Sequence, residues 1–360
     1  MRLAPHRLLF GLALAQAAIS LLAWTIAPTA YGDPARHVHE MVFGHALGVA
    51  GGFLLTRLSS RALLAVAGAW MLARAAYLWP EVPILLLAAL ALTSTAAFAV
   101  PAARTFLRGA KRAGSLVFPA LMIGFLAAEA LFQLGDLGLI SSAWPGAWLG
   151  LGLVILLIAA MGGRLVGAAA SGAVQRSGGP RIAPNLGLER GMLALLALGF
   201  VAKALGQQGM LPATSLAVGA LLLGARLISW RPGLHRSQGD VLALAAGQGW
   251  LCIGLLTHAV AEVGLSPLIP TSAALHLVTV GGIGGTTLVM TIRASAQREA
   301  RPIPVRAAPL VAGLMGFAAL LRCFGMPAVY PAAALVWTLA TLVAAWAVFV
   351  PPTRQDQRGK

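Results

Sequence analysis

The chain has 360 residues, of which 59% are apolar and only 10% are charged, and its mean hydropathy is +0.85. This composition lies far outside that of soluble globular proteins and indicates an integral membrane protein. The net charge of +16 would suggest a nucleic-acid partner for a soluble protein, but membrane proteins carry such an excess on their cytoplasmic loops. We therefore expect a lipid bilayer as the surrounding partner and no nucleic acid.

Apolar stretches long enough to cross a bilayer occur twelve times. They predict an all-α, polytopic transmembrane bundle with spans at approximately 8–26, 35–57, 61–79, 82–100, 115–134, 145–166, 187–206, 211–230, 240–261, 270–292, 306–325 and 329–350. We expect one integral membrane domain over residues 1–350, made of two six-span halves joined near 167–186. Residues 351–360 form a polar tail.

The distribution of basic residues predicts the orientation of the chain. If the N-terminus is cytoplasmic, all but four of the 26 lysines and arginines fall on cytoplasmic segments, as the positive-inside rule requires. The four exceptions are Arg36, Arg74, Lys203 and Arg322. Both termini are then cytoplasmic. Arginines at the inner helix ends, such as Arg226, are expected to reach the interface.

The second expected span opens with an unusual group of ionisable side chains. Asp33 followed by Pro34 is typical of a helix start, and the first turns then contain three histidines, a glutamate and a methionine. These are His37, His39, Glu40, Met41 and His45. Ionisable groups within the membrane are costly, which makes this cluster a candidate functional site.

Helical spacing divides this group between two sides. His37, Met41 and His45 recur every four residues and share one stripe, and a thioether with two imidazoles suits copper. Glu40 heads a neighbouring ladder of glycines, which would let a flat macrocycle or another helix approach closely.

Other ionisable side chains fall in the same expected outer leaflet. Glu129 is a buried carboxylate that needs a cationic partner or carries protons. Arg74, Lys203 and Arg322 are its candidate partners, and the alternative for these cations is to anchor the propionates of a bound haem. His258 and His276 lie near the ends of their spans and are further candidate ligands.

Five stretches of the chain resemble the NnrS family of bacterial membrane proteins. They are residues 37–44 (HVHEMVFG), 52–56 (GFLLT), 161–165 (MGGRL), 274–284 (ALHLVTVGGIG) and 290–295 (MTIRAS). The resemblance covers essentially the whole chain, agrees with the span count and implies a multi-pass protein of the bacterial cytoplasmic (inner) membrane, with its site in the periplasmic half. Cytochrome oxidase core subunits offer a looser analogy, with haem-ligating histidines on their second and tenth spans, but the sixth and seventh spans here contain no histidine.

The family resemblance implies a haem and copper protein that binds or responds to nitric oxide and protects against nitrosative stress. We expect His39 and His276 to hold haem, of b-type, with Arg74 and Arg322 on its propionates. Copper is expected at a site drawn from His37, His39, Met41, His45, His258 and His276. Glu40 and Glu129 would orient these ligands or move protons.

Two points stay open at this stage. Whether the protein is an enzyme is not decided by the sequence, and any turnover would be a haem-dependent redox reaction of nitric oxide with an electron donor that the sequence does not identify. The alternative function is a transporter or metal-trafficking permease that uses the same histidine and glutamate groups as a substrate or proton path.

Overall fold

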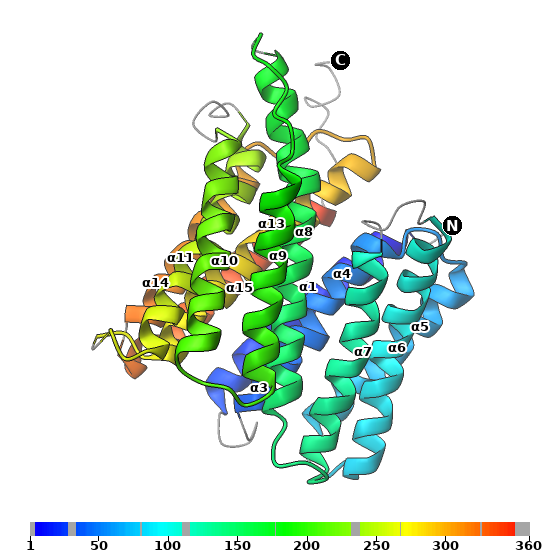
Figure 1. Cartoon of the computed structure of the whole chain (residues 1–360). Helices are drawn as coiled ribbons and strands as arrows, with labels where there is room; N and C mark the ends of the chain where they lie inside the picture. Colours follow the sequence, from blue (N-terminus) through cyan, green and yellow to red (C-terminus); the bar gives the residue numbers. More distant parts are fainter. Residues whose placement is uncertain are drawn as a thin grey trace. The chain divides into compact units, whose positions relative to one another are not determined.

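The computed structural model describes residues 4–27, 34–79, 81–109, 116–176, 178–231, 238–266, 268–324 and 326–349. All regular structure in these residues is helical, as expected (Figure 1). Asp33 and the tail 351–360 lie outside them. The chain forms two compact units, unit 1 with residues 1–157 and 200–208, and unit 2 with residues 158–199 and 209–360.

Every expected span corresponds to a helical stretch. In chain order these are α1 (Pro5–Ile26), α3–η1–α4 (Pro34–Leu54), α5 (Ser60–Leu78), α6 (Ile84–Gly109), α7 (Val117–Asp136), α8 (Trp144–Arg176), α9 (Leu186–Ala204), α10 (Met210–Ser229), α11 (Gly239–Glu262), α12–η4–α13 (Thr271–Arg298), α14 (Ala307–Phe324) and α15 (Tyr330–Phe349). The short 3₁₀ turn η5 (Pro327–Val329) precedes α15.

Ten of these helices are long and apolar enough, by length and composition, to cross a membrane. The remaining two differ for physical reasons. The second stretch is continuous over Pro34–Leu54, but Arg36, Glu40 and three histidines lower its apolar character. Helix α9 contains Glu189, Arg190 and Lys203 within 19 residues, which lowers its apolar character.

The joint expected near 167–186 begins inside a helix. Helix α8 has 33 residues and continues through Ser171 to Arg176. No residue of α8 before Arg176 ends the helix. A glycine among helix-forming residues lowers the stability of a helix but does not by itself terminate it. The predicted joint near 167–186 lies within unit 2.

In unit 1, the other helices pack around the second helical stretch. Helix α1 packs along η1 and α4, while α5, α6 and α7 lie next to one another (Figure 1). Close approach depends on small residues, as is usual for helices in lipid. A Cβ on Gly51 would lie 2.1 Å from the Phe98 ring of α6, and one on Gly52 would lie 2.4 Å from the Phe10 ring of α1.

Unit 2 surrounds the tenth helical stretch in a similar way. Helices α11 and α14 pack against η4, and α14 packs against α15. A Cβ on Gly281 of η4 would lie 2.8 Å from the Trp250 ring, and one on Gly316 of α14 would lie 3.0 Å from the same ring. The indole of α11 therefore fills the space between two glycine-bearing helices.

Candidate functional site

The most polar region in the interior of unit 1 is a cluster of side chains from five helices. The central ones are His39 on α3, Glu40 on η1, Arg74 on α5 and Glu129 on α7, and all four are buried. Gln16, Tyr77, Thr95 and Gln133 add polar atoms from α1, α5, α6 and α7. The second helical stretch is thus connected to α1, α5 and α7 through direct side-chain hydrogen bonds, and to α6 through Glu129.

Glu40 is held from two sides within this cluster. Its Oε1 accepts a hydrogen bond from Arg74 Nη1 at 2.5 Å, and its Oε2 accepts one from Gln16 Nε2 at 2.6 Å. The guanidinium supplies the opposite charge that a buried carboxylate needs. Arg74 was a candidate partner for Glu129, but the structure pairs it with Glu40.

His39 lies between the two carboxylates. Its Nδ1 is 3.2 Å from Glu40 Oε1, and its Nε2 is 2.8 Å from Glu129 Oε1. Aromatic rings of Phe43, Tyr77 and Phe132 surround the imidazole, with centroid distances of 4.9, 4.4 and 4.6 Å. The ring is fully buried and fixed in orientation.

Glu129 has three partners, of which Gln133 and Thr95 were not singled out by the sequence. Its Oε1 accepts from Gln133 Nε2 at 2.7 Å, and its Oε2 accepts from Thr95 Oγ1 at 2.8 Å. His39 is the third partner. Among the expected cations, Lys203 lies over the Trp148 ring at 4.5 Å and Arg322 over the Tyr330 ring at 3.7 Å.

The predicted stripe of His37, Met41 and His45 is altered by the π-helical segment Glu40–Ala46, which has seven residues. His37 stacks on Trp24 of α1 with 5.0 Å between ring centroids, and His45 Nδ1 lies 3.1 Å from the Ala13 carbonyl oxygen. These two α1 positions are about 16 Å apart along the helix at ~1.5 Å per residue. The structure therefore does not bring the two imidazoles together, and Met41 is half-buried between their levels.

In unit 2, two of the predicted ligands lie at the same turn. His276 Nδ1 is 2.7 Å from the Ser272 carbonyl oxygen, and His258 Nδ1 is 3.2 Å from the Thr271 carbonyl oxygen. These carbonyls belong to adjacent residues at the start of α12 (Thr271–His276). His258 Nε2 also lies 3.9 Å from Glu262 Oε2.

His39 and His276 occupy equivalent positions in their helices. Each is the last residue of a six-residue α-helix, and a π-helix follows directly, η1 (Glu40–Ala46) after His39 and η4 (Leu277–Gly284) after His276. A glycine also follows each histidine five residues later, Gly44 after His39 and Gly281 after His276. Since π-helical insertions are rare and frequent at functional sites, this shared feature marks both histidines.

A second buried ion pair, in unit 2, was missed by the sequence analysis. Arg226 is 3% exposed rather than extended to the interface. Its Nη1 donates to Glu189 Oε2 at 2.9 Å, and its Nη2 donates to Gln248 Oε1 at 2.9 Å. The available signal was the Gly162-Gly163 pair, because a Cβ on Gly163 would lie 2.8 Å from the Glu189 carboxylate.

The described residues fit a metal or haem group to different degrees. The Ser272 carbonyl orients His276 through Nδ1, as a backbone carbonyl usually does for a metal-bound histidine. Arg74 has Nε and Nη2 buried with no hydrogen-bond partner in the described part of the chain, which suits a carboxylate such as a haem propionate. His39 would bind iron only if Glu129 withdrew from its Nε2. No group of three or more His, Cys, Asp or Glu side chains within the described ranges is arranged to hold a metal ion.

The fold and this buried site define a class: a multi-pass helical membrane protein with histidines and carboxylates in its interior. The family described as NnrS protein matches residues 1–351, so the chain belongs to the NnrS family. No curated protein and no solved structure matches it.

Proposed function

We propose that this protein is a haem and copper protein of the inner membrane that binds or responds to nitric oxide and protects the cell against nitrosative stress. Membership of the NnrS family supports this proposal. When bound, ferrous haem supplies an iron that binds nitric oxide directly. The lipid bilayer, nitric oxide and an electron donor are the partners of this function.

The observation that carries the proposal is the pair of histidine-bearing π-helices. His39 and His276 precede π-helical segments in glycine-rich helices, and such segments are rare and frequently lie at functional sites. A purely structural role would not require the same uncommon geometry after both histidines.

The proposed roles rest on family membership, and the contacts add how the residues are oriented. His276 and His39 are the haem ligands, while Arg74 and Arg322 neutralise the propionates. Glu40 and Glu129 fix the orientation of the His39 ring through contacts of 3.2 and 2.8 Å. Copper is proposed at ligands chosen from His37, Met41, His45 and His258, in addition to the two haem histidines.

Substitution of the two histidines tests this assignment. Purified His276→Ala and His39→Ala variants should lose most of the haem that the unaltered protein carries, and the double variant should lose all of it. His6→Ala is the matched control, because His6 is a buried histidine of α1 that contacts Phe10 rather than a π-helix. Full haem in the double variant would remove both residues from the site.

A transporter or metal-trafficking permease is the second candidate. It is favoured by the buried group of His39, Glu40, Arg74 and Glu129, since ionisable clusters inside membrane helices often mark substrate or proton paths. Reconstituted vesicles distinguish the two functions. Uptake of copper that Glu129→Gln abolishes would support transport, whereas haem binding without uptake supports the proposed response to nitric oxide.

A further inference from the structure

The carboxylate on the Nδ1 side of His39 is anchored by a cation. Glu40 Oε1 accepts a hydrogen bond from Arg74 Nη1 at 2.5 Å, and Glu40 Oε2 accepts one from Gln16 Nε2 at 2.6 Å. The same Oε1 lies 3.2 Å from His39 Nδ1. Glu40 cannot turn away from the imidazole without weakening a buried ion pair, which is strongly unfavourable.

The carboxylate on the Nε2 side of His39 has neutral partners instead. Besides His39, Glu129 accepts hydrogen bonds from Gln133 Nε2 at 2.7 Å and from Thr95 Oγ1 at 2.8 Å. In the described part of the chain, its hydrogen-bond partners include no lysine or arginine. Hydrogen bonds from neutral donors are weaker than those from a guanidinium. Glu129 can therefore turn away from His39 at a lower cost than Glu40.

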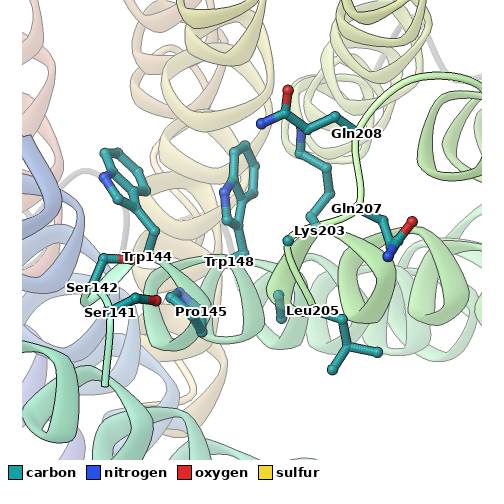
Figure 2. A pocket seen from close by; sticks show the side chains of 11 residues that line it. Ser141, Ser142, Trp144, Pro145, Trp148, Lys203, Leu205, Gln207 and Gln208 are labelled. Carbon is teal, nitrogen blue, oxygen red and sulfur yellow. The ribbon is translucent and has the colours of Figure 1, made fainter. Parts of the chain in front are cut away.

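The lysine that the sequence suggested as a partner of Glu129 packs elsewhere in unit 1. Its Nζ lies 4.5 Å from the centroid of the Trp148 ring. Figure 2 shows the Lys203 chain beside Trp148, in a cavity whose described lining includes no residue of the buried cluster. Lys203 thus does not anchor the Glu129 carboxylate.

A second position for the Glu129 carboxyl group is available beside Tyr77. Gln133 Nε2 lies 2.7 Å from both Glu129 Oε1 and Tyr77 Oη, so these two oxygens are close to each other. Tyr77 Oη also lies 3.3 Å from His39 Nε2. A rotation of the carboxyl group would exchange its contact with His39 for one with Tyr77. Since His39 and Glu129 are fully buried, water does not replace either partner.

We propose that Glu129 masks Nε2 of His39 in the haem-free protein and turns to Tyr77 when haem binds. The mask rests on the proposed function, because it matters only if His39 holds haem. A histidine binds a metal through one ring nitrogen, while a hydrogen bond on the other nitrogen orients the ring. Glu40 remains the orienting partner on Nδ1, and Glu129 frees Nε2. The proton between Nε2 and Glu129 stays on the carboxyl group, which donates it to Tyr77 Oη.

Titration of the haem-free, detergent-solubilised protein with haem, followed by the Soret band, tests the mask. Glu129→Gln keeps the size of the side chain and removes its charge. This variant should bind haem about tenfold more tightly, on the order of the difference between a charge-assisted and a neutral hydrogen bond. Tyr77→Phe removes the second position of the carboxyl group and should weaken haem binding by up to about tenfold. Glu40→Gln should also weaken it, because the orienting contact on Nδ1 is loosened.

Asp136→Asn is the matched control, because Asp136 is a second carboxylate of α7 and pairs with Arg36 at 3.4 Å. Its haem affinity should equal that of the unaltered protein. Glu129→Asp is a second variant in case Glu129→Gln does not fold. It keeps the charge but shortens the side chain away from Nε2, and it should also bind haem more tightly.

The sign of the change separates a mask from a structural role, since a variant that only loosens the fold does not bind haem more tightly. If the unaltered protein binds haem and Glu129→Gln binds it equally well or more weakly, the mask is overturned and the proposed function stands. Absence of haem from both proteins would overturn the proposed function, and the mask with it.

Discussion

At the scale of single residues, the buried cluster of unit 1 contains two carboxylates, one guanidinium and one imidazole. Glu40 and Arg74 are joined at 2.5 Å, and Glu129 and His39 at 2.8 Å. Charges buried in this way are tolerated only with partners, because desolvation costs several kcal/mol for an uncompensated ion. Each member of the cluster should therefore be expensive to remove alone.

Arg74→Met should destabilise the protein by about 3–5 kcal/mol, since it leaves the Glu40 carboxylate buried without its cation. The measurement is the free energy of unfolding in detergent. Arg36→Met is the control, because the Arg36–Asp136 pair at 3.4 Å is partly exposed and should be worth less than about 1 kcal/mol. Equal effects of the two substitutions would contradict the central place of Arg74.

The sequence predicted that a carboxylate at Glu129 needs a partner, but not which one. A polar side chain in a membrane helix needs a hydrogen-bond partner inside the protein, and this need can be inferred from the sequence alone. The partner depends on which helices become neighbours, and Thr95 and Gln133 look like ordinary polar residues of apolar spans. The same limit concealed the Arg226–Glu189 pair.

At the scale of elements, the π-helices position both histidines. Neither η1 nor η4 was predicted, because periodicity analysis assumes 3.6 residues per turn and a π insertion adds a residue without a distinct sequence signal. Helix existence and approximate bounds were predicted well, since long apolar stretches are the strongest signal in a membrane protein. The stripe of His37, Met41 and His45 assumed a regular period of 3.6 residues, and η1 changes the angular spacing along it.

Gly254→Ala tests the packing that supports the His276 helix. A Cβ at Gly254 on α11 would lie 2.6 Å from the Val278 nitrogen and 2.9 Å from the Leu277 carbonyl carbon. These are backbone atoms of η4, so no side-chain rotation relieves the contact. We expect a loss of about 1–3 kcal/mol in the free energy of unfolding.

Gly313→Ala is the matched control for this substitution. Gly313 lies on α14, and a Cβ there meets nothing within 4 Å. Alanine should be neutral or stabilising by up to about 1 kcal/mol at such a helical position. If Gly254→Ala behaved like Gly313→Ala, close contact between α11 and η4 would not support the His276 helix.

At the scale of the whole molecule, the distribution of basic residues predicts that both termini are cytoplasmic. A fluorescent protein fused to the C-terminus should fluoresce in cells, and alkaline phosphatase at the same position should be inactive. Fusions after residue 140, between α7 and α8, should give the opposite pattern. Active phosphatase at the C-terminus would reverse the proposed orientation and move the histidine cluster to the cytoplasmic half.

The absorption spectrum of the purified, detergent-solubilised protein, oxidised and then reduced with dithionite, tests the central claim most directly. Metal analysis on the same sample and addition of nitric oxide complete the measurement. The account predicts a haem Soret band, α and β bands that sharpen on reduction, and a further shift with nitric oxide. Absence of both haem and copper in protein from cells supplied with both would contradict the proposed function and favour the transporter.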